Sequence, residues 1–209
     1  VVSLSILVCG YSLNLTWFQK CILSFSGATV AGFVNQSVDS FLIRLLTNAP
    51  ITSFDFVEGS WLFKLLRYAI FFVLIGGTIL TMLRSRQVQS TTIESLEFSS
   101  FLCLTLLISP ISWVHYYLFL LLPIALYIGG QLNIPNRWPW HAAMVLSIVL
   151  LIGPNIINTP HHHVMATFTR HILVSHYFWG GILLLGILLA TILKTGQESK
   201  IQESIILRI

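Results

Sequence analysis

Two short segments carry most of the polar and aromatic side chains that could bind a charged or sugar-bearing ligand. The first, VNQSVDSFLIRLL, holds two amides and an arginine, and the second, SPISWVHYY, holds a histidine among aromatic residues. A guanidinium group binds phosphate through two parallel hydrogen bonds, and imidazole and amide groups donate to phosphate or sugar oxygens. The candidate ligand-binding residues are therefore Asn35, Gln36, Arg44, Trp113, His115 and Tyr116.

The same residues also have a purely structural interpretation. Proline and aromatic residues are typical of a turn at the membrane surface, where Trp and Tyr are enriched. Arg44 could reach the interface from an amphipathic helix, and Asn35 or Gln36 could cap that helix. Both interpretations stay open at the level of the sequence.

A general base or a metal site would need acidic residues or well-spaced histidines. Asp39 is the weak candidate for a general base, and otherwise the catalytic residue is unknown from this chain. The run His161 to His163 has no carboxylate or cysteine nearby, and adjacent residues point in different directions, so it does not predict a metal site. We expect neither a metal nor a cofactor.

The elements that position these residues are predicted to be membrane helices. Of the 209 residues, 56% are hydrophobic and only 9% are charged, and the mean hydropathy is +0.85. A soluble protein has about 25% charged residues, so a soluble fold is excluded. The 11 Lys and Arg residues form no dense patch, which argues against a nucleic-acid partner.

Uncharged stretches indicate about six membrane spans, because about 20 apolar helical residues cross a bilayer. Residues 98–136 are long enough for two spans and are interrupted by SPISW, which predicts a hairpin with its turn at Pro110. The other predicted spans lie within residues 1–19, 65–83, 138–154 and 171–193. We therefore predict an all-α fold, a polytopic transmembrane helical bundle forming a single domain over residues 1–209.

The distribution of positive charge predicts the orientation of the bundle. Six Lys and Arg residues fall on the face shared by both ends of the chain, mostly in short connections such as Arg84 to Arg86, and five fall on the other face. Because short cytoplasmic loops are enriched in Lys and Arg, both ends are predicted to be cytoplasmic. Residues 17–64 then form an extracytoplasmic segment with an interfacial amphipathic helix. The candidate residues would face the outside in a multi-pass protein of the cell membrane.

The two polar segments resemble motifs of a known family. SPISWVHYY followed by LLP resembles the Ser-Pro-Ile-Ser-Trp-x-His-His … Leu-Leu-Pro signature of glycosyltransferase family 87, the polyprenyl-phosphate-mannose-dependent α-mannosyltransferases of the GT-C superfamily. VNQSVDSFLIRLL resembles the family's Asn-Gln-Ser-x-x-x-x-x-x-Arg-Leu stretch. The resemblance covers residues 10–130. Tyr116 replaces the usual second histidine, and Asp39 stands where Asn is common.

The resemblance implies a hexosyltransferase that takes its sugar, foremost mannose, from a polyprenyl monophosphate carrier. The acceptor would be a glycolipid or a polysaccharide on the extracytoplasmic side. In the family the general-base carboxylate belongs to the first extracytoplasmic loop, so we expect this chain to be the C-terminal portion of a longer protein and to lack that carboxylate. The partners are then the sugar donor, the acceptor and the lipid bilayer.

The alternative function is a non-catalytic polytopic transporter or lipid-handling membrane protein. That function predicts ionisable residues at the middle of the membrane and an internal repeat. The sequence shows no clear instance of either feature.

Overall fold

The computed structural model describes residues 2–23, 27–47, 49–85, 90–154, 169 and 172–206. Within these ranges the chain is a helical bundle with one small antiparallel sheet, which confirms the predicted fold class. The helices of the bundle are α4 (Trp61–Ser85), α5 (Thr91–Ile108), η3 (Val114–Leu120), α6 (Leu121–Ile128), α7 (Trp138–Ile152), η4 (Leu173–Ser175) and α9 (His176–Ile206). The remaining elements are α1 (Val2–Cys9), α2 (Tyr11–Trp17), η1 (Phe18–Ile22), β1 (Ala28–Val30), α3 (Val38–Leu46) and β2 (Phe56–Glu58).

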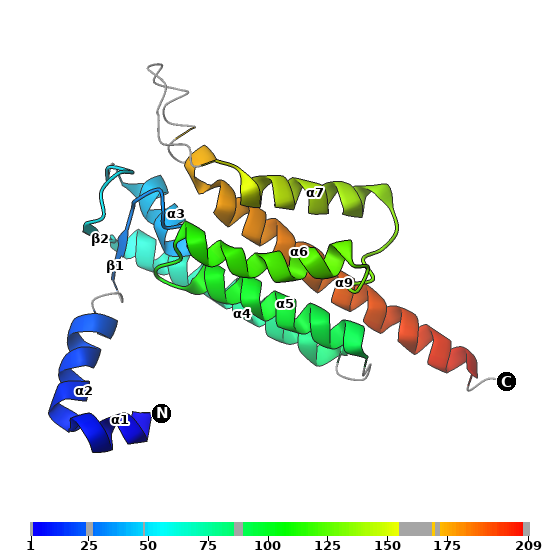
Figure 1. The fold of residues 1–209 in the computed structure, drawn as a ribbon, viewed down its shortest axis with the longest axis horizontal. Helices are drawn as coiled ribbons and strands as arrows, with labels where there is room; N and C mark the ends of the chain where they lie inside the picture. The colour runs from blue at the N-terminus through cyan, green and yellow to red at the C-terminus, as the bar shows by residue number, and fades with distance from the viewer. Residues whose placement is uncertain are drawn as a thin grey trace.

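Helix α9 is the central element of the bundle and contacts α4, α5 and α7 (Figure 1). Two glycines allow this close packing. A Cβ atom on Gly180 would lie 2.9 Å from Leu151 Cγ of α7, and one on Gly181 would lie 3.2 Å from Leu107 Cδ2 of α5. The Gly180–Gly181 pair therefore serves helix packing. The pair Gly76–Gly77 does not, because added Cβ atoms there would meet nothing within 4 Å.

Among the described residues, three helical segments are long and apolar enough to cross a membrane: Trp61–Ser85, Thr91–Ile108 and Leu173–Gln197. Two further apolar segments, Val114–Ile128 and Trp138–Ile152, are shorter. The predicted hairpin over 98–136 is present, since α5 ends at Ile108 and the chain turns through SPISW before η3 begins. Of the six predicted spans, the described residues thus provide three of full length.

The predicted first span, residues 1–19, is broken into α1 and α2 at Gly10, whose φ of 79° is unfavourable for residues with a side chain. The Asn14 side chain bridges the bend, because its Nδ2 donates to Gly10 O at 2.8 Å and its Oδ1 accepts from Ser5 Oγ at 2.8 Å. Figure 1 shows α1 and α2 lying apart from the bundle. They therefore do not form one straight membrane helix.

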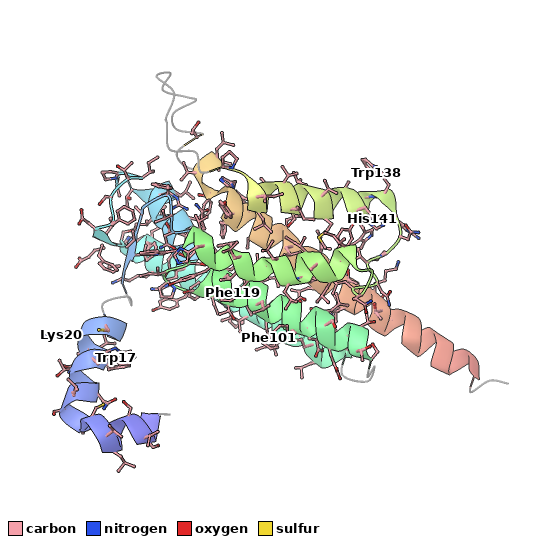
Figure 2. The ribbon with its side chains drawn as sticks, in the orientation of Figure 1. Trp17, Lys20, Phe101, Phe119, Trp138 and His141 are labelled. Carbon is pink, nitrogen blue, oxygen red and sulfur yellow. The ribbon has the colours of Figure 1, made fainter. Side chains whose placement is uncertain are left out.

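Large apolar side chains cover the outside of the bundle. Phe101 of α5 is 51% exposed and Phe119 of η3 is 62% exposed (Figure 2). Phe72 of α4 is 80% exposed. An apolar exterior of this extent is unfavourable in water and favourable against lipid tails. The protein is a membrane protein whose bundle lies in a lipid bilayer.

The two ends of the bundle are formed by different elements. One end, here called the motif end, consists of β1, α3, β2, the turn 109–113 and η4 (Figure 1). The opposite end contains the last turn of α4, the first turn of α5 and the first turn of α7, where Trp138 and His141 lie (Figure 2). Both segments singled out from the sequence lie at the motif end.

Candidate functional site

The two polar segments are hydrogen-bonded to each other at the motif end. Asn35 and Trp113 form an antiparallel β-bridge. The backbone N–H of Gln36 donates to Ser112 O at 2.8 Å, and the N–H of Val114 donates to Val34 O at 2.8 Å. Segments separated by more than seventy residues thus form one unit, here called the motif unit: residues 29–44 together with residues 109–117.

The Asn35 side chain joins the two segments of the motif unit. It is fully buried, and its Oδ1 accepts from the N–H of Ser112 at 2.9 Å. Its Nδ2 donates to Val30 O and to Pro110 O, each at 3.2 Å. An amide is suited to this position because it donates and accepts at once. Asn35 therefore holds the turn that presents SPISWVHYY.

Gln36 connects the motif unit to the start of α9. Its Nε2 donates to Val174 O at 2.8 Å, and its Oε1 accepts from the N–H of Phe178 at 3.4 Å. Its backbone carbonyl accepts from Tyr117 Oη at 2.7 Å. Gln36 is fully buried, and neither it nor Asn35 caps α3, because Ser37 accepts from the N–H of Ser40 and is the N-cap.

Arg44 is fully buried, with its guanidinium inside the motif unit. Nη1 lies 3.2 Å from Ala31 O, 3.2 Å from Gly32 O and 2.9 Å from Asn35 O. Nε and Nη2 both donate to Ser175 Oγ, at 3.3 and 3.1 Å. Burial lowers the pKa of Arg44 to about 9, so the group remains cationic at neutral pH.

This position of Arg44 differs from both sequence interpretations. It does not reach the membrane interface, since Val38 to Arg44 of α3 are all buried. In this conformation the guanidinium also presents no open face to a ligand, because it binds the loop carbonyls and Ser175. Helix α3 forms where the sequence predicts an amphipathic helix, but it is covered by neighbouring elements.

Asp39 forms a buried ion pair with Arg67 of α4. The distance from Asp39 Oδ1 to Arg67 Nε is 3.0 Å, and the Asp39 side chain is fully buried. Its Oδ2 has no hydrogen-bond partner in the part of the chain that the structure describes. The carboxylate is therefore closed to solvent in this conformation, and it holds α3 against α4.

The pKa of Asp39 gives this ion pair a pH dependence. Burial raises the pKa from 3.8 to about 6, and the positive charge of Arg67 offsets only part of this effect. The folded protein therefore binds a proton that the unfolded chain lacks between these two values. We expect stability to rise by about 1 kcal/mol through this group as the pH falls from about 7 to about 5. In Asp39→Asn the corresponding gain should be absent.

The measurement is thermal or denaturant unfolding of detergent-solubilised wild type and Asp39→Asn at both pH values. Comparing the two proteins cancels the pH dependence of all other groups. An equal change in both proteins would contradict the assignment.

Trp113, His115 and Tyr116 form the exposed face of the motif unit. Trp113 is 38% exposed, Tyr116 is 40% exposed, and His115 is exposed as well. The His115 ring makes edge contacts with both neighbours, at centroid distances of 5.5 Å to Trp113 and 4.5 Å to Tyr116. A hydrogen-bonding imidazole between two aromatic surfaces is suited to a ligand that has both apolar faces and oxygen atoms, such as a sugar or a sugar phosphate.

The structure thus divides the six candidate residues into two groups of three. Asn35, Gln36 and Arg44 are buried and position the unit, whereas the aromatic pair and His115 are available to a ligand. Sequence reasoning missed three supporting residues. Arg67 pairs with Asp39, Tyr117 binds the Gln36 carbonyl, and Ser175 binds Arg44. Arg67 and Ser175 show no signal in the sequence, because their partners are remote along the chain.

The sequence predicts no metal site at the histidine run 161–163. No group of three or more His, Cys, Asp or Glu residues that could hold a metal comes together among the described residues. His161 to His163 lie outside those residues.

Comparisons with known proteins do not assign the chain to a family. No family model, no curated protein and no solved structure matches the chain.

Proposed function

We propose that this protein is a multi-pass membrane glycosyltransferase. It transfers a hexose, with mannose as the first choice, from a polyprenyl monophosphate carrier to a glycolipid or polysaccharide acceptor. The reaction takes place on the extracytoplasmic side, which the motif end faces in this proposal. The short connections at the opposite end, around Arg84 and Arg137, carry positive charge, which supports that orientation.

The observation that carries the proposal is the pairing of the two segments with family-like sequences. They lie apart in the sequence, yet they share a β-bridge and the side-chain hydrogen bonds of Asn35. The product of this pairing is an ordered, exposed His115 between Trp113 and Tyr116 at one end of a membrane bundle. A site at the end of the bundle suits a donor whose phosphate lies at the membrane surface and whose lipid lies in the bilayer.

The proposed chemistry is a direct displacement at the anomeric carbon. The acceptor oxygen forms a bond to C1 of the sugar, and the bond from C1 to the phosphate oxygen breaks, so the polyprenyl phosphate leaves with the electron pair. The acceptor proton passes to a general base. His115 donates a hydrogen bond to the departing phosphate, where negative charge increases in the transition state. Displacement in one step inverts the anomeric centre.

The buried residues have a positioning role in this mechanism. Arg44 fixes the loop 31–35 to Ser175, and Asn35 fixes that loop to the turn before His115. The general base is not assigned within the described residues. Asp39, the weak candidate, is paired with Arg67 and closed to solvent in this conformation.

The proposal is tested by the choice of donor. Membranes from cells that express the protein from its full coding sequence are incubated with labelled polyprenyl-phosphate mannose or, separately, with labelled nucleotide-linked mannose while carrier charging is blocked. We expect label in a glycolipid or polysaccharide product from the lipid-linked donor only, above membranes lacking the protein. Movement of the intact donor across the membrane without a glycosylated product would instead support the lipid-handling alternative.

A further inference from the structure

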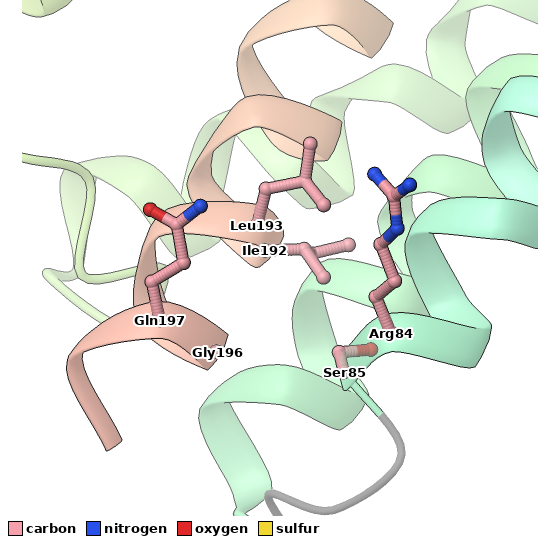
Figure 3. A pocket seen from close by; sticks show the side chains of 6 residues that line it. All are labelled: Arg84, Ser85, Ile192, Leu193, Gly196 and Gln197. Carbon is pink, nitrogen blue, oxygen red and sulfur yellow. The ribbon is translucent and has the colours of Figure 1, made fainter. Parts of the chain in front are cut away.

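A cavity of about 340 Å³ lies between α4 and α9 at the opposite end of the bundle (Figure 3). It is remote from the motif unit, so it takes no part in the proposed sugar transfer. Its lining residues are Arg84, Ser85, Ile192, Leu193, Gly196 and Gln197.

The cavity lies at the depth of the membrane surface. Arg84 and Ser85 are the last two residues of the candidate span Trp61–Ser85, and Gln197 is the last residue of the candidate span Leu173–Gln197. Both walls are therefore the ends of apolar helices that face the same side. Lipid headgroups lie at this level, with the acyl chains directly beneath them.

The lining of the cavity is polar on one part and apolar on another. Ile192 and Leu193 supply the apolar part, whereas the Arg84 guanidinium stands across from Leu193 (Figure 3). Within the described part of the chain, Arg84 has no ion-pair or hydrogen-bond partner, so its donors are available to a ligand. The Ser85 hydroxyl is not available, because it lies 3.0 Å from Met82 O and 3.1 Å from Glu97 Oε1.

Two further features shape the cavity. Gly196 leaves space in its wall, since a Cβ atom there would meet only Ser85 Cα, at 3.9 Å. Glu97 of α5 contributes negative charge near Ser85, although its carboxylate already accepts a hydrogen bond from that residue. Arg84 is therefore the cation among the residues that line the cavity, and the nearby Glu97 carboxylate is expected to reduce its attraction for an anion.

We propose that this cavity binds the phosphate of an anionic phospholipid from the adjacent leaflet. Arg84 binds the phosphate through two parallel N–H donors, and the Gln197 amide lies on the water side. Ile192 and Leu193 contact the first carbons of the acyl chains. A basic cavity between membrane helices at the level of the headgroups is suited to such a lipid. The site is separate from the proposed sugar-transfer site and does not depend on it.

The test is lipid binding to the purified protein in neutral detergent, followed by native mass spectrometry. The protein is titrated with phosphatidylglycerol or with phosphatidylcholine of the same chain length. We expect the first phosphatidylglycerol to bind about five- to tenfold more tightly than phosphatidylcholine, since one cation near anionic headgroups contributes about this factor. Arg84→Gln should remove that preference.

The matched control is Arg137→Gln, which removes the same charge from an exposed arginine at the same end but outside the cavity. It should retain the preference for phosphatidylglycerol. A second variant, Gly196→Leu, fills the cavity without a change of charge and should weaken binding of the first lipid. Glu97→Gln should strengthen it.

Four outcomes would overturn the proposal. The first is equal binding of the two lipids by the wild type, and the second is an equal loss in the Arg84 and Arg137 variants. The third is displacement of the lipid by millimolar inorganic phosphate, which would show a site for free phosphate rather than for a lipid headgroup. Retained binding in a folded Gly196→Leu variant would likewise place the lipid elsewhere.

Discussion

Replacing Arg44 by methionine is expected to destabilise the protein by about 3 to 5 kcal/mol, because it breaks several buried hydrogen bonds at once. Methionine is similar in length but has no donor. The carbonyls of Ala31 and Asn35 and the hydroxyl of Ser175 would each lose a hydrogen bond while remaining buried. Each buried group without a partner costs about 1 to 3 kcal/mol. The measurement is unfolding of the solubilised protein and the yield of folded protein.

Arg44→Lys separates the structural role from a direct role in donor binding. Lysine keeps the charge but has one nitrogen, which cannot reach the loop carbonyls and Ser175 together. We expect an intermediate loss of stability, with Arg137→Lys as the exposed control that changes nothing. Unchanged stability combined with lost sugar transfer would contradict the structural role and would indicate that Arg44 contacts the donor phosphate.

The architecture of the bundle could be predicted from local patterns in the sequence. Low charge indicates a membrane protein, and Pro110 within a double-length apolar stretch predicts the hairpin between α5 and α6. A glycine pair alone does not predict close helix packing, because Gly180–Gly181 packs against α7 and α5 whereas Gly76–Gly77 meets no neighbour. The low charge and the hairpin depend on residues that are near one another in the chain, so both can be predicted from the sequence alone.

The bend at Gly10 shows where local patterns fail. A single glycine in an apolar run is compatible with a continuous helix, and nothing in residues 1–19 marks the break. The bend is fixed by the hydrogen bonds that Asn14 makes to Ser5 and Gly10. A polar side chain in an apolar helix can form several different hydrogen bonds, so the sequence does not predict which partners Asn14 takes.

The burial of Arg44 could not be predicted for a different reason. An arginine on an amphipathic helix has the same local pattern whether it reaches the interface or points inward. Its direction is decided by Ser175, which is 131 residues away. The ion pair between Asp39 and Arg67 likewise depends on how α3 packs on α4. The sequence therefore predicts the two segments that pair in the motif unit but not which of their residues are buried.

His115→Leu is expected to have the second large effect, and this effect concerns activity rather than stability. The side chain is exposed, so its replacement leaves the buried hydrogen bonds of the motif unit intact. If His115 donates to the leaving phosphate, its loss removes an interaction of about 1 to 3 kcal/mol that tightens in the transition state. The rate should then fall about five- to hundredfold.

The most direct measurement is the rate of mannose transfer from polyprenyl-phosphate mannose by wild type, His115→Gln, His115→Leu and Tyr116→Phe at equal levels of folded protein. Glutamine keeps a neutral donor, so we expect His115→Gln to be partly active and His115→Leu to be nearly inactive, with Tyr116→Phe milder than either. Transfer by His115→Leu at the wild-type rate would contradict the role of His115 and reduce the SPISWVHYY segment to a structural turn.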